Sequence, residues 1–104
     1  FRDCPPELDW VRLWGEPCET DLNDPFVQYV RQCAEEITGK EPEIMGIPSL
    51  SDMRFLHLYS KTPAVMYGGL GGNTHDVDEW VDIDSLISSI KITAFTILHW
   101  CGYK

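Results

Sequence analysis

A lone histidine stands between a glycine-rich loop and a block of acidic residues, and this stretch is the part of the sequence best suited to chemistry. Residues 67–84 read YGGLGGNTHDVDEWVDID, so the loop Gly68–Gly72 runs into His75. Imidazole is a common zinc ligand, although a single histidine is more often a packed or surface residue. The acids that follow lack the order of a calcium loop and are first expected to cap helices or face solvent. These acids are Asp76, Asp78, Glu79, Asp82 and Asp84.

The glycines do not form a phosphate-binding motif, because they match neither G-K-S/T nor G-x-G-x-x-G. The chain of 104 residues carries 8 Lys and Arg against 17 Asp and Glu, a net charge of −9. Such a charge repels nucleic acid and anionic membranes. No apolar run reaches the ~18 residues of a membrane span. Neither nucleic acid nor membrane is therefore expected as a partner.

The four cysteines, Cys4, Cys18, Cys33 and Cys101, form no C-x-x-C pair, which argues against a zinc knuckle or a redox motif. With 43% hydrophobic residues, reduced thiols in a cytoplasmic protein are expected, and a disulfide framework is the less favoured alternative. The sequence begins at Phe1 without a signal-like segment, so we expect a piece of a longer protein.

Helical periodicity is clearest between residues 24 and 39. Asp24 suits the N-cap, Pro25 suits the first helical position and Gly39 supplies a stop. The apolar residues that recur at helical spacing are Phe26, Val30, Ala34 and Ile37, widened by Val27 and Cys33.

Two further helices are expected. A short one begins at the cap Ser51, and the last one, residues 85–101, begins at the cap Asp84 and ends at Gly102. The second half of the last helix is apolar on several sides, so we expect it to be largely enclosed. The residues of the short helix expected to face inward are Phe55, Leu56 and Tyr59.

Three apolar segments are expected to be strands: residues 7–15, and the buried segments 43–47 and 64–67. Strands that alternate with helices predict an α/β fold with a mostly parallel sheet. Sites in such sheets lie beyond the carboxyl ends of the strands. If the two buried strands are parallel neighbours, the loops 48–52 and 68–75 lie side by side.

These motifs together resemble the C-terminal portion of the di-zinc amidohydrolases, a family that includes acetylornithine deacetylase and succinyl-diaminopimelate desuccinylase. The resemblance rests on Ser51-Asp52-Met53-Arg54, on the glycine turn at residues 67–72, and on His75 followed by Asp78-Glu79. It covers roughly residues 20–104 in the same order and spacing. It implies a fragment of a three-layer α/β/α zinc-exopeptidase-like domain. Residues 1–18 would then be the last strand of a lid or dimerisation domain, and residues 19–104 the C-terminal part of the catalytic domain.

The resemblance also implies site residues. His75 would be a ligand of one of two zinc (or cobalt) ions, whose other ligands and general base come from an N-terminal half. No motif for those partners occurs in this chain. The backbone of Ser49, Leu50 and Ser51 would bind the carboxylate of the substrate, although relatives often carry Gly-Thr at the first two of these positions.

Further residues would support the site or let the substrate approach. Gly71 and Gly72 would let the backbone pass close to the substrate. Asp52 and Arg54 would form an ion pair that holds the carboxylate-binding loop, and Glu79 would support the metal site.

The implied function is hydrolysis of a small N-acyl amino acid, or of a small peptide with a free carboxylate, by a zinc-dependent, cytoplasmic, homo-oligomeric enzyme. The fragment alone is expected to be inactive. The alternative is a non-catalytic relative that only binds a ligand or a partner subunit.

Overall fold

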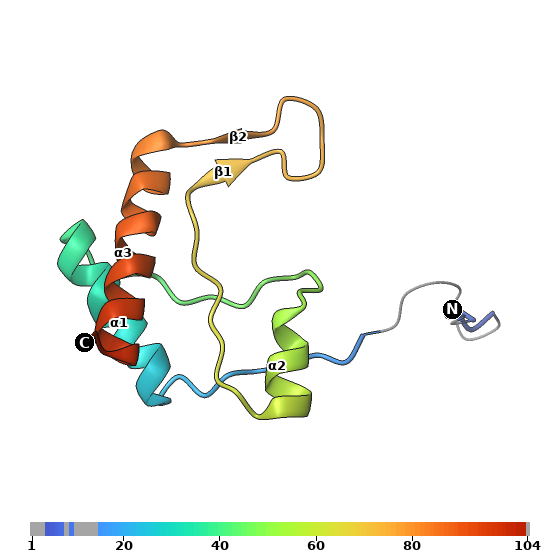
Figure 1. Ribbon diagram of the computed structural model, residues 1–104. Helices are drawn as coiled ribbons and strands as arrows, with labels where there is room; N and C mark the ends of the chain where they lie inside the picture. Colours follow the sequence, from blue (N-terminus) through green and yellow to red (C-terminus); the bar gives the residue numbers. More distant parts are fainter. Residues whose placement is uncertain (1–3, 8, 10–14, 104) are drawn as a thin grey trace.

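The computed structural model describes residues 4–7, 9 and 15–103, and helices dominate this part of the chain. The helices are α1 (Pro25–Thr38), α2 (Met53–Ser60) and α3 (Ile83–Cys101). The strands β1 (Gly71–Gly72) and β2 (Trp80–Val81) form an antiparallel hairpin. α1 and α3 lie side by side, and the hairpin projects from the N-terminal end of α3. Two extended segments of the chain separate α2 from this helix pair (Figure 1). Helices together with a short sheet are compatible with a fragment of an α/β fold.

Helix α1 begins and ends as the sequence predicts. The Asp24 carboxylate accepts a hydrogen bond of 2.8 Å from the amide of Phe26, which satisfies one of the free donors of the first turn. Gly39 ends the helix in the left-handed conformation at φ 70°, and its amide donates to the Glu35 carbonyl at 2.8 Å. The cap, the proline and the glycine are local signals, so no distant contact is needed to set these bounds.

The core lies between α1 and α3. Ile92 is 1% exposed and packs with Cys33 and Ala34 of the predicted apolar stripe. At the end of the interface, the Trp100 ring meets Phe26 edge-on, with ring centroids 5.2 Å apart, and lies 5.7 Å from Tyr29. This aromatic cluster holds the C-terminal end of α3 against the start of α1.

The starts of the other two helices differ from the predictions. α3 is capped by Asp82 rather than Asp84, because the Asp82 carboxylate accepts from the Ser85 amide at 2.7 Å. Both aspartates fit an N-cap by residue type, and Asp82 is the one whose amide also donates to the Leu70 carbonyl of the hairpin. At α2 the cap position is Asp52, although the Ser51 hydroxyl accepts from the Met53 amide at 3.2 Å. Gly102 follows α3 as predicted.

The predicted strands at 43–47 and 64–67 are wrong for this chain, since neither segment forms a ladder with any described residue. A strand needs a neighbour that satisfies its backbone groups, and the sequence pattern alone does not supply one. Both segments instead run extended between the helices (Figure 1). A mostly parallel three-layer sheet therefore stays a prediction, and the strand predicted at 7–15 falls largely outside the described residues.

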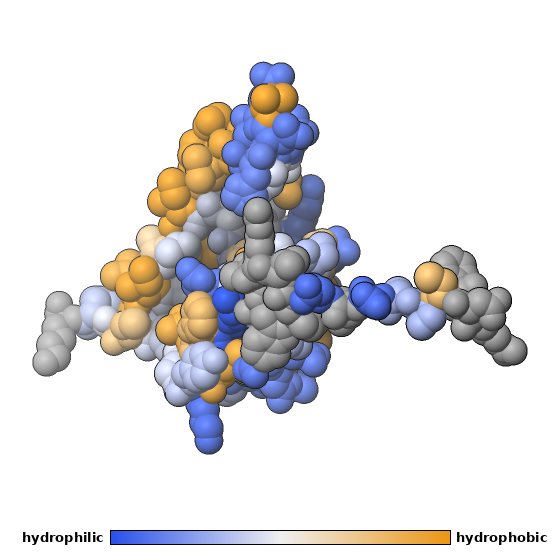
Figure 2. Space-filling view, turned by 90° about the vertical axis from the view of Figure 1, so that its right-hand side faces the viewer, coloured by the Kyte–Doolittle hydropathy of each residue, from blue (hydrophilic) through white to orange (hydrophobic). Residues whose placement is uncertain are grey.

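The expected enclosure of the apolar faces is also wrong. In the second half of α3, Ile97 is 56% exposed, and the three residues of α2 expected to face inward are exposed. The accessible surface is 9173 Å², whereas a compact monomer of 11.9 kDa exposes about 5,900 Å². Apolar patches interrupt the hydrophilic surface on the face drawn in Figure 2. Among the described residues, the buried cluster therefore lies where α1 meets α3, and Ala64 is the further buried apolar residue outside the helices. None of the described helices is both long and apolar enough to cross a bilayer.

Candidate functional site

The predicted histidine lies at the end of the β1–β2 hairpin, an element that sequence reasoning treated as a loop. Gly71 pairs with Val81 and Gly72 pairs with Trp80. The amide of Asp82 extends this pairing by donating to the Leu70 carbonyl at 2.8 Å. Glycines and acids weigh against strands by propensity, and the Trp80-Val81 pair was the only strand-like signal that could have revealed the hairpin.

Both predicted substrate glycines are required by the hairpin itself. A Cβ on Gly71 would lie 2.6 Å from the carbonyl oxygen of Trp80. A Cβ on Gly72 would lie 2.7 Å from Nε1 of the same tryptophan and within 3.0 Å of two further indole atoms. The missing side chains therefore make room for the opposite strand. That reason for glycine is independent of a substrate, whose approach to these residues stays a prediction.

The loop between the strands is held in an unusual backbone path. Asn73, His75 and Asp78 have φ of 56°, 65° and 57°, a left-handed region that costs roughly 1–2 kcal/mol for a residue with a Cβ. The amide of Asp76 donates to the Asn73 carbonyl at 2.9 Å. The Asn73 side-chain amide reaches the Asp78 carbonyl at 3.3 Å and ties the two sides of the loop together. Asparagine, aspartate and histidine are the residues that tolerate this region best.

His75 itself is exposed at this loop, and its ring receives no hydrogen bond from any residue that the structure describes. An imidazole held in this way offers a nitrogen to a ligand or a metal ion without first having to break a contact. Glu79, which was expected to support the site, is also exposed and makes no side-chain hydrogen bond within the described part of the chain.

The hairpin is joined to the start of α3 by a serine and an aspartate that sequence reasoning did not assign to the site. The amide of Leu70 donates to the Ser85 hydroxyl at 2.8 Å, and that hydroxyl donates to the Asp82 carbonyl at 2.8 Å. Because Asp82 also caps α3, one pair of residues fixes both the helix start and the base of the hairpin. The available signal was Asp82 as an N-cap residue directly before the apolar run of α3.

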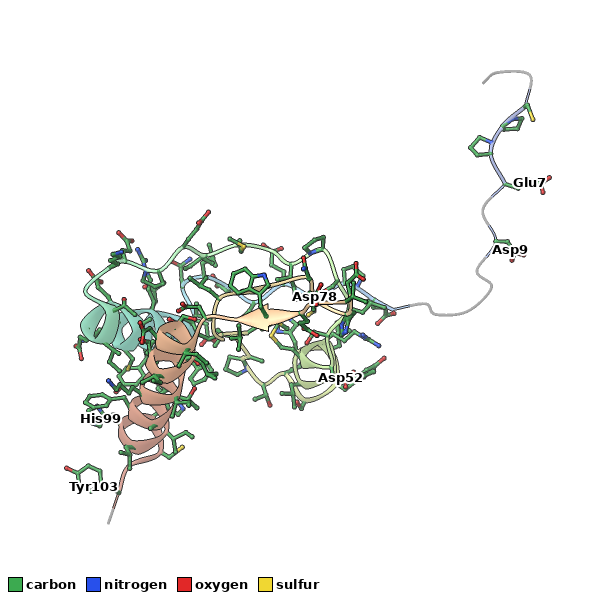
Figure 3. All side chains as sticks on the ribbon, turned by 90° about the horizontal axis from the view of Figure 1, so that it is seen from above. Glu7, Asp9, Asp52, Asp78, His99 and Tyr103 are labelled. Atoms are coloured by element: carbon green, nitrogen blue, oxygen red, sulfur yellow. The ribbon has the colours of Figure 1, made fainter. Side chains whose placement is uncertain are left out.

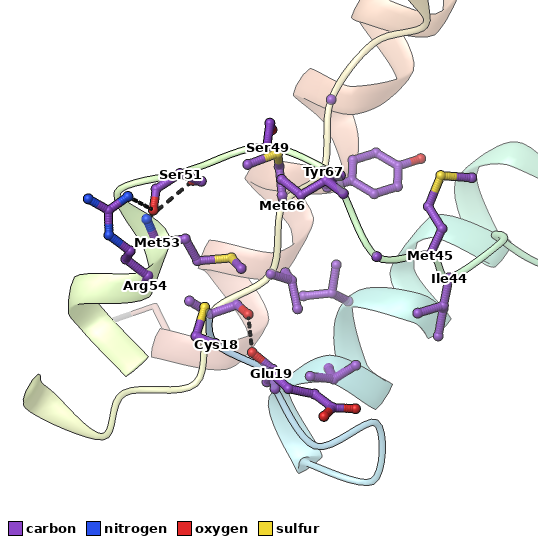
Figure 4. A pocket seen from close by; sticks show the side chains of 18 of the residues that line it. Cys18, Glu19, Ile44, Met45, Ser49, Ser51, Met53, Arg54, Met66 and Tyr67 are labelled. Carbon is purple, nitrogen blue, oxygen red and sulfur yellow. Dashed lines mark hydrogen bonds between the residues drawn. The ribbon is translucent and has the colours of Figure 1, made fainter. Parts of the chain in front are cut away.

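The predicted carboxylate-binding loop lies at the other end of the site, before α2 (Figure 4). The Arg54 side chain donates to the Ser51 carbonyl at 3.4 Å, and its guanidinium lies 4.4 Å from the centre of the Phe55 ring. The expected ion pair with Asp52 does not form. Asp52 is the N-cap of α2 and Arg54 is the second residue of the helix, and side chains two positions apart do not face one another on a helix. Among the described residues the single ion pair joins Arg31 and Glu41.

A groove of about 1120 Å³ runs between α1, α2 and the two extended segments. Its wall includes Ser49, Leu50, Ser51 and Arg54, together with the stretch 64–69 (Figure 4). His75 and the hairpin glycines do not line it. The structure thus brings the carboxylate-binding loop beside the segment that leads to the glycine turn, and leaves the histidine loop outside the groove.

No cluster of three or more His, Cys, Asp or Glu side chains within residues 4–7, 9 and 15–103 could hold a metal ion. His99 lies on α3, apart from Asp52 and Asp78 (Figure 3). Its ring contacts Phe95 edge-on at 4.7 Å. All four cysteines carry free thiols.

Comparison with known proteins covers nearly the whole chain. The sequence pattern of peptidase family M20/M25/M40 matches residues 6–99. Succinyl-diaminopimelate desuccinylase from Bradyrhizobium diazoefficiens is 37% identical over 96 residues, which cover 88% of this chain and 24% of that protein. The protein of the same name from Bradyrhizobium sp. (strain ORS 278) is 31% identical, with 82% of this chain and 21% of the relative covered. The one from Maricaulis maris is 34% identical, with 73% and 19% covered.

This chain therefore spans about a quarter or less of the length of these curated relatives. No solved structure gives a significant match. The family match includes the serine–aspartate loop, the glycine turn and the histidine motif in one continuous range. The chain belongs to peptidase family M20/M25/M40.

Proposed function

We propose that this chain is the C-terminal part of a zinc-dependent amidohydrolase that removes an acyl group from an N-acyl amino acid, or cleaves a small peptide with a free carboxylate. The observation that carries the proposal is that a single family match, residues 6–99, spans the Ser51–Arg54 motif, the glycine turn and the His75–Glu79 motif. The sequence motifs leave the acyl group open, and the relatives are named succinyl-diaminopimelate desuccinylases, which favours a succinyl group.

His75 is the residue of this chain that would hold a metal ion. Its donor type suits zinc or cobalt, and it is exposed on a loop whose backbone is held by its own hydrogen bonds. Structural and catalytic zinc sites use three or four protein ligands, so residues beyond those described here would complete the shell of each of two ions. A bound ion supplies polarisation of the amide carbonyl and lowers the pKa of a coordinated water.

The loop Ser49–Ser51 would hold the substrate carboxylate. The backbone amides of these three residues donate to no described residue, so they are available to an anion. Arg54 adds a positive charge beside the loop in a chain whose net charge is −9. Its bond to the Ser51 carbonyl would help hold the loop in one conformation, so Arg54 would act as a positioning residue.

The remaining proposals concern organisation. Residues 1–18 would end a lid domain and residues 19–104 would form the C-terminal part of the catalytic domain. Gly71 and Gly72 would flank the bound substrate, and Glu79 would support the loop that carries His75. The protein would act as a homo-oligomer in the cytoplasm, where thiols stay reduced.

The test is His75→Ala in the protein at its natural length. We expect metal content to fall from about two ions per chain toward one, and kcat to fall by orders of magnitude, because one ligand is lost from a site that tolerates few losses. His57→Ala on α2 is the matched control, since it removes the same side chain away from the histidine loop. Two tightly held ions with normal turnover in His75→Ala would refute the assignment, and unchanged metal content with lost turnover would favour a non-metal role.

A further inference from the structure

The loop that carries His75 is closed by few contacts. Only two residue pairs join β1 and β2, and a two-stranded hairpin of this size is marginal in water by itself. Two of the strand residues are glycines, which contribute no side chain to the pairing. The loop between the strands also contains three left-handed residues, which must be held by their surroundings. A further contact has to keep this hairpin in one conformation.

Trp80 provides that contact. Its indole lies directly over Gly72, with Nε1, Cε2 and Cζ2 at 2.7, 2.9 and 3.0 Å from the point that a Cβ on the glycine would occupy. Gly72 is also its partner across the strands, so the ring covers the bare backbone of its own neighbour. An aromatic ring that covers a cross-strand glycine is a known device for stabilising a weak strand pair.

Trp80 is connected along the chain and across the strands to both ends of the loop that carries His75. It follows Glu79 directly, and its carbonyl oxygen is the atom that a Cβ on Gly71 would meet at 2.6 Å. The chain then passes to Asp82, which caps α3 and donates from its amide to Leu70. The indole therefore stands between the rigid start of α3 and the free end of the hairpin that presents His75.

We propose that Trp80 is a positioning residue for His75: its indole, packed on Gly72, holds the hairpin in the conformation that presents the imidazole to the metal ion. This inference rests on the proposed function. Trp80 would not touch the ion, and it would act by excluding other conformations of the loop 73–79. A side chain that keeps strand propensity but lacks a ring would keep the fold and lose the positioning.

The test compares Trp80→Val and Trp80→Phe in the protein at its natural length. Valine keeps the strand preference without reaching across to Gly72, whereas phenylalanine restores a ring there. We expect zinc affinity of the weaker-binding site, measured by competition with a chelator, to fall at least tenfold in Trp80→Val and to stay within about threefold of wild type in Trp80→Phe. Trp100→Val is the comparison for a general loss of stability, because Trp100 packs on Phe26 and Tyr29 at the far end of α3, away from the hairpin; it should leave zinc affinity within about threefold of wild type.

Amide hydrogen exchange supplies a readout that does not depend on metal. The amides of Asp76 and Asp82, which donate within the loop and at its base, should exchange faster in Trp80→Val and not in Trp80→Phe. Unchanged exchange in Trp80→Val would overturn the inference, and so would faster exchange with unaltered zinc affinity. If His75→Ala loses an ion while Trp80→Val behaves as wild type, the proposed function stands and only this inference fails. If His75→Ala keeps both ions, the proposed function fails, and with it the link from Trp80 to the metal.

Discussion

A single added methyl group at Gly71 tests whether the hairpin needs its glycines for packing. In Gly71→Ala the new Cβ would stand 2.6 Å from the Trp80 carbonyl oxygen, 0.8 Å short of the 3.4 Å at which ordinary contact begins. The obstacle is backbone, so it cannot swing aside as a flexible side chain would. Gly71 does not have a positive φ, so alanine is not strained by its own backbone and the whole effect is steric. Overpacking of this kind costs about 1–3 kcal/mol.

That cost would act on a strand ladder of only two pairs. Since 1.4 kcal/mol is tenfold in an equilibrium, the population of the closed hairpin should fall roughly 5- to 150-fold relative to its open forms. The assay is amide exchange of Asp82, whose bond to the Leu70 carbonyl exists only when the strands are paired.

Gly68→Ala is the matched control. A Cβ at Gly68 would meet no atom within 4 Å, and its φ is not positive, so the same substitution in the same glycine-rich run should leave the Asp82 amide as protected as in wild type. Equal exchange in the two variants would refute the packing explanation. Gly71 would then have to be explained by some other requirement, such as room for the substrate.

Two other predictions concern the chain by itself. Ile92→Ala should lower the free energy of unfolding of the 104-residue chain by about 2–5 kcal/mol, because Ile92 is fully buried against Cys33 and Ala34. Ile90→Ala, at a side chain that is 60% exposed, should lower it by less than about 1 kcal/mol. Urea titrations that give equal losses for the two variants would contradict this. The isolated chain should hydrolyse no N-acyl amino acid with added zinc or cobalt, since it offers one candidate metal ligand, and turnover above a metal-only control would contradict this. The isolated chain should also self-associate through its exposed apolar faces, and a stable monomer in light scattering at micromolar concentration would contradict that.

The bounds of a helix were predicted correctly where a single residue type fits the backbone requirement at its end. Asp24, Pro25 and Gly39 bound α1 as expected, because each of them satisfies groups within one turn of the helix. The same reasoning failed at α3, where Asp82 and Asp84 are both acceptable caps. The one that caps the helix is the residue whose backbone is also paired to Leu70 of the hairpin, and such a distant contact is invisible in the local pattern.

The predictions that failed concern structure that forms only when another segment of the chain packs beside it. The segments 43–47 and 64–67 have the composition of buried strands, and a strand exists only when another backbone lies beside it. The apolar residues of α2 and of the second half of α3 have the spacing of core faces, and a face is buried only when something covers it. Within the described residues, α1 covers one side of α3, and the segment before the hairpin contacts α3 only at its start.

The sequence by itself determined the bounds of α1, the stop after α3 and the motifs by which the family match could be expected, because these depend on residue types at short range. Only the tertiary structure decided that Gly71 and Gly72 are needed for a hairpin, that Trp80 covers one of them, and that Arg54 turns to the Ser51 carbonyl instead of Asp52. The physical reason is the same in each case. A glycine, an indole and a guanidinium can each make several different low-energy contacts. Which contact forms is decided by the atoms that the folded backbone brings within contact distance.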